Sequence, residues 1–253
     1  MIEKLDLDQQ IKNAKAAQQD NFIHTVYHGS SMVVRNPEYS KCRPKNDFGR
    51  GFYCTPDENL AKEWAAAADF GKSGYANQYS LNLKGLKVVN FHSREYTLLN
   101  WLAILLKNRD FQPSTYAGKE NREYILHHFF PDIDDTDVII GYRADDSYFS
   151  WAKDFINNII TFEQLAKAMH LGQLGDQIVL VSPKSFEHIE FVSSIEVTQS
   201  WYYTQRLAKE KRANLEYDKL KMTKADKFDL TASDIREGGL INDDFRVSEN
   251  IHR

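Results

Sequence analysis

Residues 47–55 read DFGRGFYCT, and residues 56–68 continue as PDENLAKEWAAAA. Two glycines precede an aromatic stretch that is typical of a short strand ending at Thr55. Thr55, Pro56 and Glu58 have the spacing of a helix start, with Thr55 as the N-cap, proline in the first position and Glu58 closing a capping box. Apolar residues then recur with helical spacing on one face: Leu60, Ala61, Trp64, Ala65 and Ala68. This stretch therefore predicts a strand that leads directly into a helix.

A second stretch, residues 25–31, reads TVYHGSS. Its alternation predicts a short strand that ends at Gly29. Glycine has no Cβ, so a ligand can approach the backbone closely there. Alone, His28 and Gly29 are more typical of a strand end and a turn. In the first stretch, alternation requires Phe52 and Tyr53 to point to opposite faces, so one ring packs in the core and the other faces a cleft.

The remaining chain contains short strands and helices without regular alternation. We expect strands at residues 75–83, 86–91, 138–141, 176–182 and 190–197, and helices at residues 93–108, 119–129, 146–157 and 161–170. This pattern disfavours a doubly wound parallel sheet and predicts an α+β fold. We divide the chain into an N-terminal helical extension (1–22), one domain (23–200), and a charged, solvated C-terminal helix and tail (201–253).

The composition indicates a folded protein without a broad nucleic-acid surface. Hydrophobic residues make up 42% of the 253 residues, enough for a sizeable core. The formal net charge is −4, and the sequence has no basic stripe of the kind that coats a duplex. Cys42 and Cys54 form no CxxC pair, so we expect reduced thiols and no zinc site. A polar N-terminus and no apolar run near ~18 residues predict a cytoplasmic protein without a membrane segment.

Several common catalytic motifs are absent from the sequence. The glycines of GRG lead into a strand rather than a helix N-terminus, which excludes a Rossmann dinucleotide loop. There is no P-loop, HExxH or GxSxG motif. The histidines show no metal-ligand spacing, so we expect no metal cofactor.

Taken together, YHGS at residues 27–30 and FGRGFYCTPDENLAKEWA at residues 48–65 resemble the first two motifs of the His-Tyr-Glu branch of ADP-ribosyltransferases. Poly(ADP-ribose) polymerases and diphtheria-type toxins belong to that branch. The chain resembles in particular DUF3990, a bacterial family grouped with these transferases and often linked to toxin–antitoxin loci. The resemblance covers roughly residues 24–197 and includes GYRADD at residues 141–146. It implies an ADP-ribosyltransferase-like split antiparallel β-sheet core with inserted helices.

The resemblance also assigns roles to residues of the first two motifs. His28 would hydrogen-bond a ribose hydroxyl of NAD. The Gly29 backbone, with Ser30 assisting, would hold the nicotinamide carboxamide. Tyr53 would stack on the nicotinamide ring, and Trp64 would either close the other side of the ring or belong to the core.

The third motif of the branch falls at Gln177, in GDQIVLVSP at residues 175–183. Most relatives have a glutamate there, which bonds the nicotinamide ribose. Glutamine can hold the hydroxyl but brings no negative charge to the developing oxocarbenium cation. We therefore consider Asp145 and Asp146 as sources of the missing carboxylate, acting as a base on the acceptor or holding Arg143. The alternative is that one of them caps the following helix.

Asp47 and Arg50 flank the glycines of the first stretch. Either they order the loop over NAD, or they form a surface ion pair that contributes little.

The resemblance implies an NAD-dependent ADP-ribosyltransferase, without a metal, that acts on a protein or nucleic-acid acceptor as a bacterial toxin with an antitoxin partner. Two rival hypotheses are a catalytically weak module that binds NAD or ADP-ribose, which Gln177 favours, and a partner-binding protein that uses the charged C-terminal helix. A related enzyme, RNA 2′-phosphotransferase, uses several basic residues at its site, and the sequence offers no evident arginine-rich set.

Overall fold

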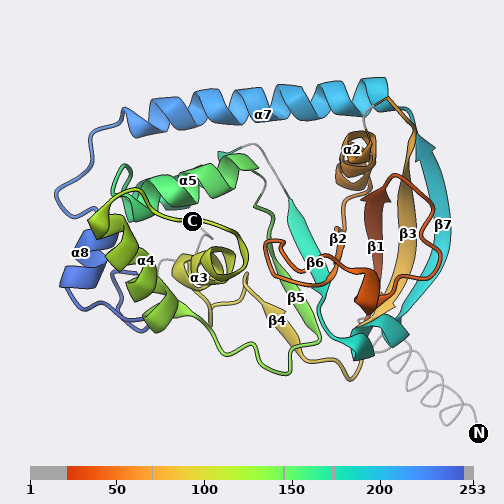
Figure 1. Cartoon of the computed structure of the whole chain (residues 1–253), viewed down its shortest axis with the longest axis horizontal. Helices are drawn as coiled ribbons and strands as arrows, with labels where there is room; N and C mark the ends of the chain where they lie inside the picture. Colours follow the sequence, from red (N-terminus) through yellow and green to blue (C-terminus); the bar gives the residue numbers. More distant parts are fainter. Residues whose placement is uncertain (1–21, 70, 145, 172–174, 248–253) are drawn as a thin grey trace, which may run out of the picture.

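The computed structural model describes residues 22–69, 71–144, 146–171 and 175–247, without the side chains of residues 146 and 147. The expected N-terminal extension therefore lies outside the described residues, apart from Phe22. The strands form two sheets (Figure 1). The first sheet has the order β1 (Ile23–Ser30), β3 (Gly74–Asn82), β7 (Ile189–Val197), and the second has the order β2 (Phe52–Cys54), β6 (Asp176–Leu180), β5 (Val138–Tyr142), β4 (Val88–Asn90).

This arrangement confirms an α+β fold, with a correction to the strand directions. The β1–β3–β7 sheet is antiparallel, but β4 and β5 of the second sheet run parallel. A wholly antiparallel core is therefore the wrong expectation. The helices α3 (Leu98–Asn108) and α4 (Tyr116–Phe129) lie between β4 and β5 in the chain and provide the crossover that a parallel pair requires.

The two sheets are joined at a corner between β1 and the end of β2. The backbone N–H of Tyr27 donates to the carbonyl of Thr55 at 2.8 Å, and the N–H of Thr55 donates back at 2.9 Å. These bonds bring the YHGS and DFGRGFYCT stretches side by side, as the sequence interpretation requires.

Helix α2 (Glu58–Ala68) begins later than the sequence predicts. Its N-cap is Asp57, whose carboxylate accepts hydrogen bonds from the N–H groups of Asn59 and Leu60. Thr55 cannot be the cap because its backbone is paired with Tyr27 at the corner. Its hydroxyl instead accepts a hydrogen bond from the N–H of Asp57.

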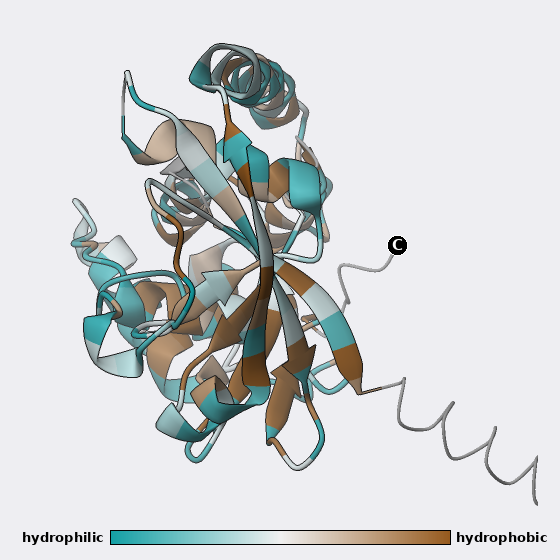
Figure 2. Ribbon diagram, turned by 90° about the vertical axis from the view of Figure 1, so that its right-hand side faces the viewer, coloured by the Kyte–Doolittle hydropathy of each residue, from teal (hydrophilic) through white to brown (hydrophobic). Residues whose placement is uncertain are grey.

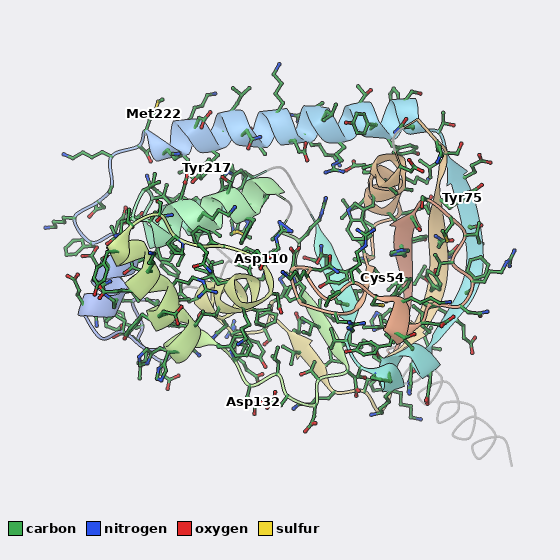
Figure 3. The ribbon with its side chains drawn as sticks, viewed as in Figure 1. Cys54, Tyr75, Asp110, Asp132, Tyr217 and Met222 are labelled. Carbon is green, nitrogen blue, oxygen red and sulfur yellow. The ribbon has the colours of Figure 1, made fainter. Side chains whose placement is uncertain are left out.

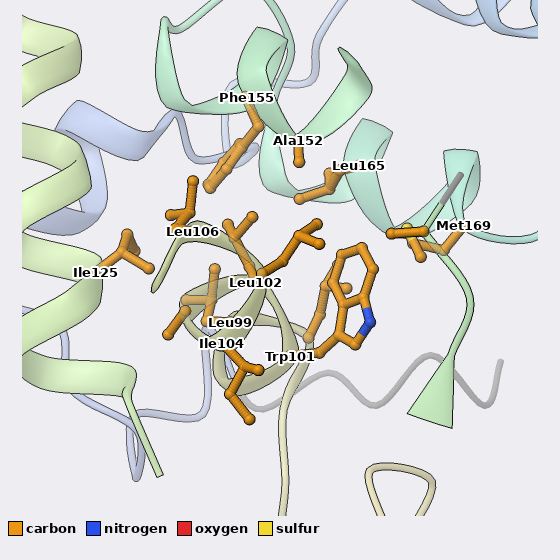
Figure 4. Packing of buried hydrophobic residues seen from close by; sticks show 14 of the residues in the cluster. Leu99, Trp101, Leu102, Ile104, Leu106, Ile125, Ala152, Phe155, Leu165 and Met169 are labelled. Atoms are coloured by element: carbon orange, nitrogen blue, oxygen red, sulfur yellow. The ribbon is translucent and has the colours of Figure 1, made fainter. Parts of the chain in front are cut away.

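Both faces of the second sheet are covered by hydrophobic side chains. On one face, Phe52, Cys54 and Leu180 pack against Val26 and Tyr79 of the first sheet. The other face packs against α3, whose residues 98–106 are all buried, and against α5 (Asp146–Ile156) and α6 (Phe162–Ala168). Figure 4 shows this helical core around Leu102 and Trp101. The predicted capping box of Thr161 and Gln164 at the start of α6 is confirmed.

The C-terminal region is only partly solvated. The long helix α7 (Gln199–Lys221) crosses the molecule along one edge and is largely hydrophilic (Figures 1 and 2). Its Tyr217, labelled in Figure 3, however, stacks on Trp151 and donates a hydrogen bond to Asp154 of α5 at 2.8 Å. Beyond α7, helix α8 (Ala232–Glu237) and the segment that follows bury the side chains of Ala232, Ile235, Leu240 and Val247 in the helical core. The expectation of a solvated tail is wrong for this segment.

Short 3-10 turns, η1 (Tyr39–Lys41) and η3 (Pro183–His188), complete the described elements. Over the described ranges, no helix combines the length and the apolar character that crossing a bilayer would need.

Candidate functional site

A pocket of about 340 Å³ lies between helix α2 and the strands β2 and β6. Two aromatic residues, the amide of Gln177, one carboxylate and three arginines contribute to its lining: Tyr53, Trp64, Gln177, Asp47, Arg109, Arg143 and Arg206. These residues come from six parts of the chain that are distant in sequence. The pocket therefore combines flat apolar surfaces with positive charge.

The register of β2 against β6 places Tyr53 and Gln177 on the same sheet face. Tyr53 is paired with Val179, and Gln177 lies two residues from Val179 on β6. Side chains of paired and alternate residues share a face. Phe52 points to the opposite face, where it is 7% exposed between the two sheets. Of the two alternatives, Phe52 is thus the core residue and Tyr53 faces the pocket.

The phenol of Tyr53 fixes the loop before β2. Its hydroxyl accepts a hydrogen bond from the N–H of Phe48 at 2.9 Å and donates one to the carbonyl of Gly49 at 2.8 Å. Burial raises the pKa of Tyr53 strongly, so the phenol stays protonated and remains a donor. Gly49 has φ of +80°, a conformation that glycine adopts without a steric cost.

Asp47 lies on this loop and is only 6% exposed. Its Oδ2 accepts a hydrogen bond from the N–H of Ala144 at 3.1 Å, and its Oδ1 lies 3.3 Å from Nη1 of Arg109. The side-chain amide of Gln177 lies near this carboxylate and helps to lower its pKa. Burial raises the pKa of Asp47 to about 6, although Arg109, the Ala144 N–H, Arg143 and Gln177 each act to lower it.

Two polar atoms at the pocket are buried and have no hydrogen-bond partner among the described residues: Oε1 of Gln177 and Nε1 of Trp64. Gln177 acts on Asp47 through its amide N–H, because a carboxylate only accepts. Oε1 is therefore an acceptor without a donor, in a residue that is 6% exposed. Buried polar groups are nearly always paired in proteins, so these two atoms indicate a site for a ligand.

The three arginines were not recognised from the sequence as a set, and only Arg143 was named there, as a partner of Asp145 or Asp146. Arg143 follows β5 and places its Cζ 5.4 Å from the ring centroid of Trp64. Arg109 follows α3, and Arg206 belongs to α7, where it pairs with Glu210 at 3.2 Å. The expectation that no arginine set exists is wrong. The set forms only in the folded chain, because its members are far apart in sequence and follow no motif.

His28 is near the pocket but does not line it. Its Nδ1 lies 2.7 Å from the carbonyl oxygen of Tyr53, and its ring packs at a tilt of 35° against Phe52, with 4.4 Å between centroids. The imidazole thus lies on the face of β2 opposite to the ring of Tyr53. Burial lowers the pKa of His28, against a raising effect of the Tyr53 carbonyl, so the neutral ring donates from Nδ1.

Packing, rather than a ligand, explains why residue 29 is a glycine. A Cβ at this position would lie 2.1 Å from the carbonyl oxygen of Ala61 and 2.6 Å from Cβ of Trp64, both on α2. Ser30 does not line the pocket, and its hydroxyl accepts only a long 3.4 Å bond from the N–H of Met32. The structure thus places Gly29 at the contact of β1 with α2.

The remaining predicted residues are not part of the described pocket. Arg50 is exposed, bonds the carbonyl of Ser40 at 3.4 Å and lies over the ring of Tyr39. The expected pairing of Asp47 with Arg50 is thus replaced by pairing with Arg109. Asp145 lies outside the described residues, and Asp146 begins α5 with a side chain that is not described. In the part of the chain that the structure covers, no cluster of metal-ligating residues forms.

Comparison with known proteins gives one match. Residues 24–191 match the model of a protein family described as a protein of unknown function, DUF3990. No curated protein and no solved structure matches the chain significantly. The matched range contains every residue that lines the pocket except Arg206 on α7.

Proposed function

Because the chain belongs to the DUF3990 family, whose description assigns no activity, we propose its function from the pocket: NAD-dependent ADP-ribosyl transfer on an ADP-ribosyltransferase-like fold. The observation that carries the proposal is the unpartnered Oε1 of Gln177 beside Tyr53 and Trp64. Gln177 is also the residue that the third motif of the His-Tyr-Glu branch would use on the ribose.

The nicotinamide, its ribose and the diphosphate of NAD each have a complementary group in the pocket. Tyr53 and Trp64 offer faces for the planar nicotinamide, and Oε1 of Gln177 can accept from a ribose hydroxyl. Arginines suit the diphosphate because the guanidinium forms paired hydrogen bonds to phosphate oxygens. His28 supports this arrangement indirectly, by holding the carbonyl of Tyr53.

The proposed reaction breaks the bond between C1′ of the ribose and the pyridinium nitrogen. The bonding electron pair stays on the nitrogen, which leaves as neutral nicotinamide. An acceptor hydroxyl or amine then bonds C1′ and loses a proton. Positioning and electrostatic stabilisation of the cation-like ribose would provide most of the rate. We further propose a macromolecular acceptor and a role as a bacterial toxin controlled by an antitoxin, which rest on the family resemblance alone.

The direct test measures nicotinamide release from NAD by the purified chain, with and without cell lysate. We expect release by wild type and a loss of at least ~10-fold in kcat/KM for Trp64→Ala and Arg143→Ala, since both remove contacts to NAD. Arg50→Ala is the matched control, because it removes an arginine outside the pocket. Equal activity of the Arg143 and Arg50 variants would contradict the proposed site.

Two other functions have a specific observation in their favour. Gln177 brings no charge, which suits a module that binds NAD without cleaving it; binding without nicotinamide release would identify this case. The three arginines also suit the 2′-phosphate of an RNA substrate. Consumption of NAD only when 2′-phosphorylated RNA is present would favour that transferase.

A further inference from the structure

We infer that Asp47 is a positioning residue that supplies the carboxylate which Gln177 lacks, a conclusion that rests on the proposed function. Asp47 and Gln177 line the same pocket, each is only 6% exposed, and the amide of Gln177 lies near enough to the carboxylate to lower its pKa. The pair Gln177 and Asp47 thus places an amide oxygen and a negative charge where a single glutamate would combine both.

The amide of Gln177 is oriented by this contact. Its N–H is the end that acts on the Asp47 carboxylate, and Oε1 is the end that is buried without a partner among the described residues. Without the carboxylate, either end of the amide could face the ligand, and only the oxygen can accept from a ribose hydroxyl. Asp47 therefore selects the amide orientation that the proposed ribose contact needs.

The position of Asp47 is itself fixed by the surrounding structure. The Tyr53 hydroxyl bonds the two residues that follow Asp47 in the loop, and the Asp47 carbonyl accepts from Nδ2 of Asn108 at 3.3 Å. Ala144 N–H holds Oδ2 at 3.1 Å. A carboxylate held on its backbone and on its side chain is preorganised, which is the condition for electrostatic stabilisation without reorganisation.

Arg109 is close to Asp47 without forming a tight pair. The 3.3 Å distance from Nη1 to Oδ1 exceeds the ~2.8 Å of a strong charge-assisted hydrogen bond. The guanidinium also lies over the ring of Phe149, with Cζ 4.6 Å from the centroid. Asp47 can therefore still act on positive charge that develops at C1′ of the ribose.

The step with water as acceptor shows what Asp47 contributes. The C1′–N bond breaks with its electron pair passing to the pyridinium nitrogen, water oxygen donates a pair to C1′, and one water proton is released. The products are nicotinamide, ADP-ribose and a proton. Asp47 forms no covalent bond in this step. Its negative charge stabilises the positive charge on the ribose, and its carboxylate favours the amide orientation that keeps Gln177 Oε1 toward the sugar.

The test compares nicotinamide release and NAD binding for Asp47→Asn, Gln177→Glu and the double variant. We expect Asp47→Asn to lower kcat by about 100-fold while the Kd for NAD changes less than ~3-fold, because charge acts mainly on the transition state. Asp110→Asn is the matched control; Asp110 is exposed, with a side chain 82% accessible, and is labelled in Figure 3. This control should keep wild-type kcat.

The double variant separates this role from a structural one. A glutamate in place of Gln177 puts a second carboxylate beside Asp47, so Gln177→Glu alone should lower kcat. In the Asp47→Asn background, the same substitution returns a single carboxylate and should raise kcat at least ~10-fold. A folding defect in Asp47→Asn would not be rescued in this way. If Asp47→Asn fails to fold, the kcat of Gln177→Glu alone still tests whether Asp47 supplies the carboxylate.

The outcomes are distinguishable. An active wild type with an unchanged Asp47→Asn variant, or with a Gln177→Glu variant that is faster than wild type, overturns the role of Asp47 and leaves the proposed function standing. A wild type that binds no NAD and releases no nicotinamide overturns both.

Discussion

At the scale of single residues, Asp47 combines a buried carboxylate with a measurable dependence on pH. Burial raises its pKa from the ordinary 3.8 to about 6. The folded state therefore binds the proton more tightly than the unfolded state between these two values. The contribution of Asp47 to stability is most favourable below pH ~4 and is lost as the pH rises through about 6.

We predict that the free energy of unfolding of wild type falls by up to about 3 kcal/mol relative to Asp47→Asn between pH 4 and pH 7. Denaturant unfolding at a series of pH values measures this difference directly. If the two proteins lose stability in parallel over this range, the carboxylate is not held in the buried, partly neutralised environment described above.

The same residue explains why stability and the proposed activity should respond oppositely to pH. The ionised carboxylate costs folding free energy, yet it is the form that would stabilise a cation-like ribose. Such a cost is typical of groups retained for function rather than for folding. The sequence marks Asp47 as a loop residue, but its burial and its contact with Gln177 depend on β6, which is far along the chain.

At the scale of elements, the close contact of β1 with α2 explains why residue 29 must be a glycine. Gly29→Ala should cost about 3 kcal/mol of stability, because the new Cβ would overlap the backbone of α2 at Ala61 and neither element can move freely. Thermal unfolding would measure the loss. Ser30→Ala, at the next position, should change stability by less than ~0.5 kcal/mol. A Gly29→Ala protein of wild-type stability that no longer binds NAD would instead support a ligand-holding role.

Sequence patterns predicted the elements better than their ends and their contacts. The strand β2, the helix after it and the capping box of α6 follow local rules, and these predictions are confirmed. The predicted N-cap of α2 is wrong because local spacing could not show that Thr55 is paired with Tyr27. Alternation separates Phe52 from Tyr53, but which ring faces the pocket depends on the packing of the first sheet.

At the scale of the whole molecule, the pocket extends beyond the segment that matches the family. Arg206 lines the pocket from α7, which crosses from α2 to the helical core (Figure 1). Tyr217 anchors the far end of α7 through Trp151 and Asp154. No local motif revealed this, because α7 reads as a polar, solvated helix with few buried residues. The position of Arg206 therefore depends on how firmly the C-terminal region is attached.

Ile235 tests that attachment. It is fully buried in the helical core, so Ile235→Ala should lower the free energy of unfolding by about 2–5 kcal/mol through lost burial and a cavity. Ile241→Ala makes the same substitution in the same segment where the side chain is 51% exposed, and it should cost less than ~1 kcal/mol. Denaturant unfolding of both variants gives the comparison. Similar losses for the two would mean that the C-terminal segment is not part of the core. A larger loss for Ile235, in one cooperative transition, would show that the segment folds with the sheets and so helps to hold α7 over the pocket.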